Sequence, residues 1–227
     1  MTQIFQPNLP VKRDNHILVH TNRMGMTTLQ VLHRLFLPDK TINAASQVTT
    51  RLVADGYLAR HDLWHKAKYY TLGKKCVRLL GVPRNKTLPR GEQVLPTDLG
   101  ALAFCCLQDT VRRRLLPHEI LAQYPWFPKQ YLCHPFCFVT DGGVKRLAII
   151  KVEMSDFPGQ VLRKHMIQLR AFREFPGFAD LIDNHQFMIV TVTTTPERRD
   201  ALITEFDGDP WYPPFAVYDY PELCNLL

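Results

Sequence analysis

Residues 26–73 read MTTLQVLHRLFLPDKTINAASQVTTRLVADGYLARHDLWHKAKYYTLG, and this stretch decides the fold of the N-terminal part of the chain. Its first apolar side chains recur at spacings of three and four residues, which places them on one face of a helix. These residues are Leu29, Leu32, Leu35 and Phe36. Thr27 and Thr28 precede them as candidate N-caps, and Pro38 follows as a helix breaker. The spacing therefore predicts an amphipathic helix between the threonines and the proline.

A second helix is predicted over residues 43–54, with Asn43 or Ser46 as its N-cap. Two β-forming runs, at residues 57–60 and 68–72, come after it and flank a short polar segment, so they predict a hairpin. Two helices followed by such a hairpin are the elements of a winged helix-turn-helix. The sequence therefore predicts that fold for the N-terminal domain.

The outward face of the second predicted helix carries short hydrogen-bonding side chains and one arginine, namely Ser46, Gln47, Thr49, Thr50 and Arg51. Such side chains meet base edges and phosphates when a helix enters the major groove of DNA. The predicted hairpin adds side chains suited to phosphate contacts, namely Arg60, His65, Lys66 and Lys68. Within this DNA-binding set, Gln47, Thr50 and Arg51 are the best candidates for base edges. A solvated helix face beside a basic loop, or a surface for protein contacts, is the alternative interpretation.

The composition favours an acidic partner such as nucleic acid. The 227 residues include 28 Lys and Arg against 21 Asp and Glu, which gives a net charge of +7 and a pI near 9.2. The six cysteines show no CxxC spacing, so buried free thiols are favoured over the faint metal signal of Cys133, His134 and Cys137. The sequence shows no signal-peptide pattern and no apolar run of roughly twenty residues, which predicts a cytoplasmic protein without a membrane segment.

Changes in composition divide the chain into four predicted segments. Residues 1–13 are expected to form an N-terminal arm, and residues 14–81 the winged-helix DNA-binding domain. Residues 82–96 are rich in Pro, Gly and charge and lack periodicity, so they are expected to form a linker. Residues 97–227 are expected to form a mixed α/β domain.

This last domain is predicted to begin with a helix capped by Thr97 or Asp98. An Asp-Gly-Gly turn at residues 141–143 then joins two apolar β-forming runs into a hairpin. The remaining elements are predicted in the order helix, strand, helix, strand, at residues 160–175, 187–193, 196–206 and 215–218. The whole chain is therefore expected to belong to the α+β class.

At the level of pattern, most of the chain resembles the replication-relaxation family of plasmid and mobile-element proteins. The resemblance rests on the segments RLVADGYLAR and YYTLGKKCVRLLG, and on a later Asp-turn-strand-Glu segment followed by a helix and an apolar strand. It implies a DNA-associated protein whose second domain is similar to the core of PD-(D/E)XK restriction endonucleases.

The resemblance raises a nuclease hypothesis for the second domain. Such a nuclease uses two acids that share a Mg²⁺ ion and a lysine that stabilises the attacked phosphate. Asp141, Lys151 and Glu153 are the candidate catalytic residues, because Lys151 and Glu153 alternate onto one strand face and Asp141 is expected nearby. Their Lys-Val-Glu order reverses the usual acid-x-Lys, and Lys164 is the candidate substitute for the missing lysine. An inactive domain without a cofactor is therefore favoured, and Mg²⁺ is the cofactor expected of an active one.

These patterns together predict a sequence-selective double-stranded DNA-binding protein that acts in transcription control or in replication or transfer of a mobile genetic element. The alternatives are a metal-dependent DNA nuclease or nickase, and a winged-helix protein-interaction module in a DNA-processing complex. In the latter, Trp126, Phe127 and Tyr131 would be exposed anchors. A homodimer and partner proteins of such a complex are further partners that this interpretation allows.

Overall fold

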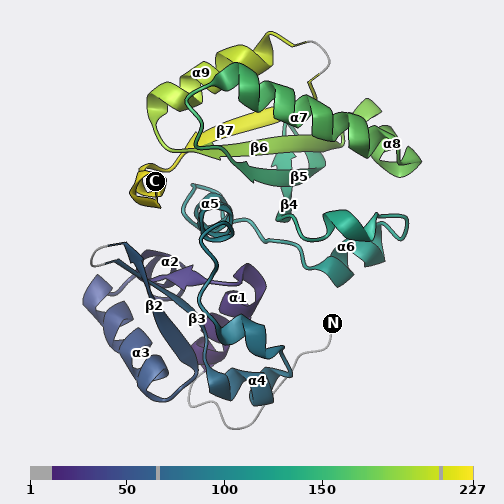
Figure 1. The fold of residues 1–227 in the computed structure, drawn as a ribbon. Coiled ribbons are helices and arrows are strands. Elements are labelled where there is room, and N and C mark those ends of the chain that lie inside the picture. The colour runs from purple at the N-terminus through teal and green to yellow at the C-terminus, as the bar shows by residue number, and fades with distance from the viewer. Residues whose placement is uncertain (1–11, 65–66, 210–211, 227) are drawn as a thin grey trace. The chain divides into compact units, whose positions relative to one another are not determined.

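The computed structural model describes residues 12–64, 67–209 and 212–226. The chain divides into two compact units, Met1–Asp98 and Leu99–Leu227, and each contains one β-sheet with helices packed on it (Figure 1). The fold is therefore mixed α+β. The N-terminal arm predicted over residues 1–13 lies almost entirely outside the described residues. None of the helices in the described ranges is long and apolar enough to cross a lipid bilayer.

The first unit contains the predicted order of helices and hairpin. Its elements are α1 (Lys12–Met24), β1 (Thr27–Thr28), α2 (Leu29–Phe36), α3 (Ile42–Ala54), β2 (Leu58–Trp64), β3 (Ala67–Leu72), α4 (Lys74–Leu80) and the 3-10 helix η1 (Arg84–Thr87). The three strands form an antiparallel sheet in the order β1-β3-β2. Apolar side chains from the helices and the sheet meet in one core, which contains Ile17, Leu18, Leu32, Leu52, Leu58, Leu72 and Cys76.

Helix α3 begins earlier than the sequence pattern predicts. Its N-cap is Thr41, whose hydroxyl accepts a hydrogen bond from the Ala44 N–H at 3.4 Å, so the caps predicted at Asn43 and Ser46 are wrong. Thr41 has an extended backbone, which is the conformation that a cap requires and that residues inside the helix lack. Gly56 has a φ of +76°, a left-handed conformation that glycine adopts without steric strain because it has no Cβ. This conformation ends the helix and lets the chain turn into β2.

The segment predicted to be a linker, residues 82–96, packs on the first unit instead. The Lys86 ammonium donates to the Asn22 carbonyl at 3.1 Å, and the Arg90 N–H donates to the Tyr69 hydroxyl at 2.8 Å. The Arg90 guanidinium also lies 3.3 Å from the Asp98 carboxylate. Residues 82–96 therefore lack periodicity because they form an irregular segment that is anchored to the first unit.

The second unit is a four-stranded mixed sheet in the order β4-β5-β6-β7. Strands β4 (Phe136–Asp141) and β5 (Val144–Val152) form an antiparallel hairpin, and β6 (Phe187–Thr193) and β7 (Phe215–Asp219) add in parallel. The helical elements are α5 (Leu95–Cys106), α6 (Pro117–Gln123), α7 (Pro158–Arg173), α8 (Pro176–Asp183) and α9 (Pro196–Asp207), with short 3-10 turns η2 (Lys129–Tyr131) and η3 (Pro221–Leu226). Helix α5 begins at Leu95, so the predictions of Thr97 or Asp98 as its N-cap are wrong.

Helices α7 and α9 lie side by side on one face of this sheet, as Figure 1 shows. Alternation along the strands therefore divides the residues of β5 and β6 between the α7 face and the opposite face. Leu147, Ile149, Phe187 and Ile189 share the α7 face, where they pack with Phe172.

The aromatic segment of residues 124–131 packs on its own unit. Phe127 is 3 % exposed and lies against Phe136 and Phe178, with ring centroids 5.3 and 4.9 Å away. Tyr131 packs against Phe172. Phe127 and Tyr131 are therefore core contacts and not the exposed anchors that the protein-interaction alternative requires, whereas Trp126 is 40 % exposed with its ring against Phe178.

Candidate functional site

The outward face of α3 presents three polar side chains to solvent. Asn43, Gln47 and Thr50 are exposed, and their spacings of four and three residues place them on one stripe of the helix. Ser46 is half-buried beside this stripe. Amide and hydroxyl groups both donate and accept hydrogen bonds, as base edges do. Gln47 and Thr50 therefore remain available for base contacts, and Asn43, expected only as a cap, joins them.

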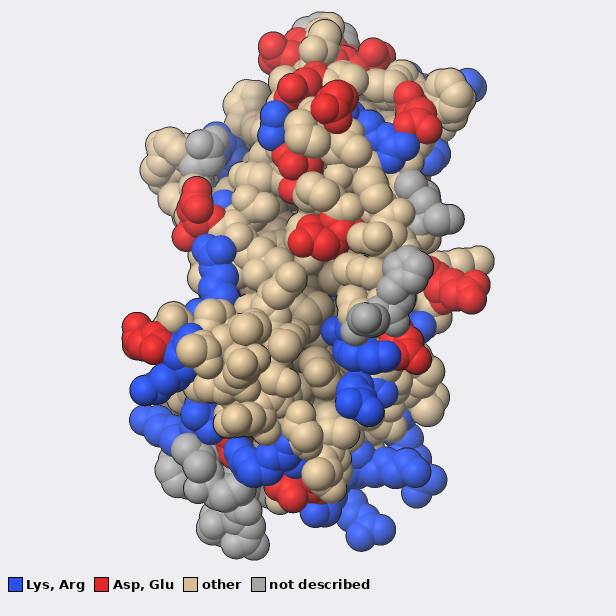
Figure 2. Space-filling model, turned by 90° about the vertical axis from the view of Figure 1, so that its left-hand side faces the viewer, with Lys and Arg blue, Asp and Glu red and all other residues tan. Residues whose placement is uncertain are grey.

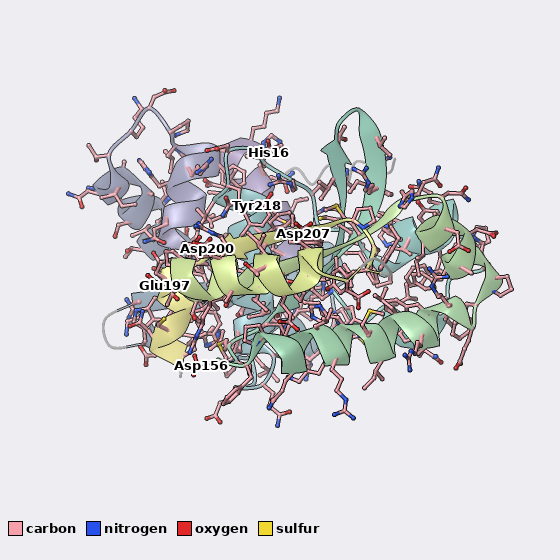
Figure 3. The ribbon with its side chains drawn as sticks, turned by 90° about the horizontal axis from the view of Figure 1, so that it is seen from above. His16, Asp156, Glu197, Asp200, Asp207 and Tyr218 are labelled. Carbon is pink, nitrogen blue, oxygen red and sulfur yellow. The ribbon has the colours of Figure 1, made fainter. Side chains whose placement is uncertain are left out.

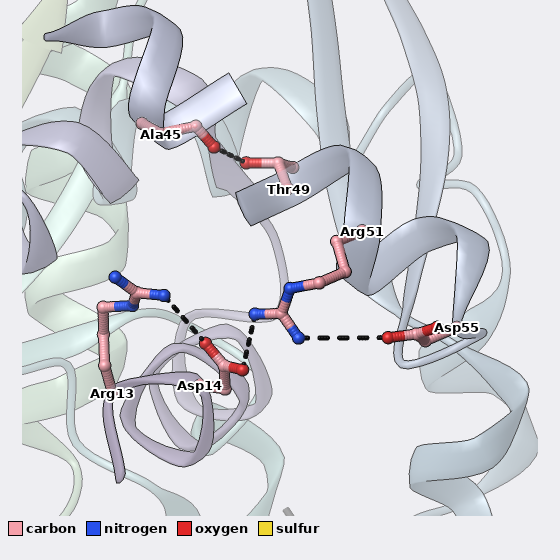
Figure 4. A network of polar contacts seen from close by, with 6 residues as sticks. All are labelled: Arg13, Asp14, Ala45, Thr49, Arg51 and Asp55. Carbon is pink, nitrogen blue, oxygen red and sulfur yellow. Dashed lines mark hydrogen bonds and ion pairs between the residues drawn. The ribbon is translucent and has the colours of Figure 1, made fainter. Parts of the chain in front are cut away.

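Thr49 lies on the opposite side of α3. Its side chain is buried, 1 % exposed, and its hydroxyl donates to the Ala45 carbonyl at 2.6 Å (Figure 4). The prediction that Thr49 faces DNA is therefore wrong. The residues at positions 45, 49 and 52 are all buried, and this helical spacing is the signal that identifies Thr49 as an inward residue.

Arg51 is occupied by an ion pair inside the first unit. Its guanidinium donates to the Asp14 carboxylate at 2.6 Å, and it lies 3.9 Å from Asp55, one turn further along α3 (Figure 4). The Asp14 side chain is fully buried. Arg51 therefore links α3 to α1, and its charge is largely neutralised before any ligand binds.

The β2–β3 hairpin supplies one exposed and one paired cation of the predicted set. Arg60 is exposed on β2. Lys68 on β3 forms an ion pair with Asp62 across the hairpin, which is consistent with their antiparallel register. His65 and Lys66 lie outside the described residues. Arg60 is therefore the cation of this hairpin best placed for a phosphate.

The positive charge of the chain is concentrated in its first unit. Residues 1–98 contain fifteen Lys and Arg against six Asp and Glu, a net charge of +9, whereas residues 99–227 contain thirteen against fifteen, a net charge of −2. Figure 2 shows Lys and Arg gathered along the edges of the first unit. In the second unit, Glu197, Asp200 and Asp207 follow one another along α9 (Figure 3). An electrostatic attraction to phosphates therefore belongs to the first unit.

The structure separates Asp141 from the other two predicted catalytic residues, Lys151 and Glu153. Asp141 ends β4 and pairs with Val144 at the turn of the hairpin, whereas Lys151 lies near the other end of β5 and Glu153 just beyond it. A strand advances about 3.3 Å per residue, so the backbones of Asp141 and Lys151 are roughly 20 Å apart. The expectation that Asp141 completes a site with Lys151 and Glu153 is therefore wrong.

Glu153 instead belongs to a chain of hydrogen-bonded polar side chains centred on the buried His165. Its carboxylate lies 3.3 Å from Nε2 of His165 on α7, and Nδ1 of the same ring lies 2.5 Å from the Tyr212 hydroxyl. Lys164, the predicted substitute lysine, is 3.7 Å from the second Glu153 oxygen. Burial raises the pKa of Glu153, but the His165 hydrogen bond and the nearby cations outweigh burial and hold this pKa below its usual value.

Lys151 lies beside this chain of polar side chains, and its ammonium group is partly shielded from water. Burial lowers its pKa to about 8, although the charge of Glu153 opposes the shift. His134, two residues before β4, lies close enough to Lys151 that burial and the Lys151 charge together lower the His134 pKa to about 4. Gln168 of α7 lies 3.4 Å from the His134 ring. Near neutral pH an uncharged imidazole, and not a second acid, therefore lies close to Lys151.

No group of three or more His, Cys, Asp or Glu side chains within the described residues has the arrangement of a metal site. Lys151 and Glu153 lie close enough to influence each other's pKa, and the partners of the Glu153 carboxylate among the described residues are His165 and Lys164. Cys133, the other half of the faint metal signal, is exposed and donates to the Gln130 carbonyl at 3.3 Å. Comparison of the chain with protein families, with curated proteins and with solved structures found no match, so the functional argument rests on geometry and charge.

Proposed function

We propose that this chain is a sequence-selective double-stranded DNA-binding protein whose first unit acts as a winged helix-turn-helix. Three features support the proposal: the succession of α2, α3 and the β2–β3 hairpin, the exposed polar stripe of α3, and the net charge of +9 on residues 1–98. The exposed stripe carries the argument, because a charged surface alone gives only sequence-independent binding. The biological setting we propose is transcription control, or replication or transfer of a mobile genetic element.

In this proposal α3 enters the major groove of the duplex. Gln47 reads a base through its amide, which pairs best with the N6 and N7 edge of adenine, and Thr50 contacts the neighbouring base. Arg60 on the hairpin holds a backbone phosphate beside the groove. Arg51 has a different role from the one its residue type suggests, since it fixes the orientation of α3 through Asp14.

The test is selection of bound duplexes from a random DNA pool, followed by fluorescence anisotropy with the selected site. Gln47→Ala and Thr50→Ala are expected to lose about 1–3 kcal/mol of preference for that site over random DNA. Gln93→Ala, which changes an exposed amide of the same unit outside α3, serves as the matched control. Selection that enriches no sequence, or variants that discriminate as well as the wild type, would refute the proposal.

The nuclease alternative has less support from the geometry. Of its three catalytic residues, only Lys151 and Glu153 share a site, and Glu153 already accepts from His165. A shared Mg²⁺ ion requires a second acid, and Asp141 is at the far end of β5. We therefore expect supercoiled plasmid to remain intact with Mg²⁺ or Mn²⁺, and Glu153→Gln to leave that result unchanged.

A further inference from the structure

A second basic surface lies on α4 and η1, away from the polar stripe of α3. Residues 73–91 contain six Lys and Arg and no Asp or Glu. Two of the six, Lys86 and Arg90, hold the segment to the body of the unit through hydrogen bonds. The other four, Lys74, Lys75, Arg78 and Arg84, are exposed, and we name them the α4 cluster.

The cations of the α4 cluster are not neutralised by the described part of the protein. None of the four forms an ion pair with a described residue, and only Lys75 has a ring contact, 5.2 Å above the centre of the Tyr57 ring. Lys68 and Arg51, in contrast, each pair with a carboxylate. Exposed like charges repel one another, so four cations without a counter-charge destabilise the fold. An anionic ligand would reduce this repulsion.

The start of α4, which carries Lys74 and Lys75 of the cluster, is held at the end of α3 by contacts to the backbone of Gly56 and Tyr57. The Lys75 N–H donates to the Gly56 carbonyl at 3.1 Å, and the Cys76 thiol donates to the Tyr57 carbonyl at 3.1 Å. Gly73 packs so closely on this turn that a Cβ there would lie 2.3 Å from the Gly56 oxygen. The start of α4 is therefore fixed to the C-terminal end of α3, with Cys76 buried beneath it.

We infer that the α4 cluster binds the phosphate backbone of duplex DNA, flanking the groove that α3 enters. The inference rests on the proposed function and adds a second contact to it. A helix inserted in the major groove is bordered by the two phosphate strands, so cations fixed at one end of that helix meet one of them. Lys and Arg contacts of this kind release counterions and carry no sequence information.

The test compares two variants in which four exposed cations become glutamine. One changes the α4 cluster, and the control changes four exposed cations of the second unit, Lys129, Lys145, Arg163 and Arg170. The control set also includes one lysine stacked on a ring, since Lys145 lies 3.9 Å from the centre of the Phe138 ring. Far-UV circular dichroism and urea midpoints establish that both variants fold. Binding to the selected site and to random duplex is then measured from low to high salt.

The α4-cluster variant is expected to bind both duplexes at least about tenfold more weakly at low salt. The magnitude of its slope of log K against log salt should fall by roughly 3.6, because four phosphate contacts are lost and each contributes about 0.9. The preference of the α4-cluster variant for the selected site should stay the same. Gln47→Ala, in contrast, should lower this preference and leave the salt slope unchanged. A wild-type slope in the α4-cluster variant, or an equal loss in the control variant, would overturn the inference while leaving selective binding by α3 intact. A wild-type protein that binds no duplex would instead remove the proposed function.

Discussion

The Arg51 guanidinium contacts the Asp14 carboxylate at 2.6 Å, and the Asp14 side chain is fully buried while that of Arg51 is 39 % exposed. The pair spans 37 residues of sequence and joins α1 to α3. A buried carboxylate without a counter-charge is strongly unfavourable. The arginine that the sequence offers as a base reader is therefore a support for the helix that carries Gln47 and Thr50.

Replacing Arg51 should destabilise the protein more than it alters DNA recognition. Arg51→Ala leaves the Asp14 charge buried, and the remaining cation paired with it among the described residues is Arg13, 3.5 Å away. We expect the free energy of unfolding to fall by about 1–3 kcal/mol, below the full value for a buried pair because Arg51 is partly exposed. Urea denaturation measures the change, and Thr50→Ala on the same helix is the control, expected within about 0.5 kcal/mol of wild type. If Arg51→Ala left the free energy of unfolding unchanged but abolished the preference for the selected site, Arg51 would instead contact a base.

Adjacent threonines of α3 should respond oppositely to the same substitution. Thr49→Val keeps the buried volume and removes only the hydroxyl bonded to Ala45, so DNA affinity should stay within about twofold. Thr50→Val removes an exposed hydroxyl from the proposed groove face, so preference for the selected site should fall. Anisotropy titrations of the two variants measure both effects. Equal losses would mean that the substitution disturbs α3 as a whole.

The local parts of the first unit follow from its sequence. Apolar spacing and β-forming runs predict α2, α3 and the hairpin, because these signals depend on neighbours within one or two turns. The prediction that Thr49 faces outward is wrong because its residue type is polar, whereas its position on α3 lies on the buried side with Ala45 and Leu52. A threonine hydroxyl that bonds the carbonyl four residues earlier needs no solvent, so polarity alone does not place it outside.

Contacts between distant residues do not follow from the sequence. The Asp14–Arg51 pair depends on how α1 packs against α3, and no short-range pattern specifies it. The separation of Asp141 from Lys151, in contrast, does follow from the turn at residues 142–143, since the residues next to a hairpin turn face each other. Asp141 therefore lies opposite the first residue of β5, whereas Glu153 lies just beyond its last residue. The residue close to Lys151 is His134.

The two described cations of the hairpin should differ in their effect on the salt dependence of binding. Arg60→Gln removes an exposed cation, and the slope of log K against log salt should fall by about 0.9. Lys68→Gln should lower the slope by less, because Lys68 already pairs with Asp62. Titrations from about 50 to 300 mM salt separate the two. A larger effect from Lys68 would show that DNA displaces Asp62 from the pair.

Lys151 should make the second unit less stable at neutral pH than at alkaline pH. Its pKa of about 8 in the folded chain is below the usual 10.5, so the unfolded chain binds more protons between these values and stability rises as the pH rises through them. Lys151→Met removes the buried ammonium and should raise the free energy of unfolding at pH 7 by roughly 1–3 kcal/mol. This gain should shrink to about a few tenths of a kcal/mol near pH 10.5, where Lys151 is neutral in the folded chain and about half neutral in the unfolded chain. Urea denaturation at the two pH values measures it, and a destabilised variant at pH 7 would instead mean that Glu153 depends on Lys151 more than on His165.

Tyr212 should stabilise the second unit through His165. The imidazole is 2 % exposed, and with its Nε2 hydrogen directed at Glu153, its Nδ1 accepts from the Tyr212 hydroxyl. Tyr212→Phe keeps the ring, which stacks on Phe206 at 4.7 Å, but leaves Nδ1 without a donor. An unsatisfied buried acceptor costs about 1–3 kcal/mol, and we expect urea denaturation to show a loss of that size. Tyr218→Phe, on a ring that packs against Phe104, is the control and should change little. If both variants kept wild-type stability, the Glu153–His165–Tyr212 chain would not contribute to folding, and its hydrogen bonds would be available to a ligand.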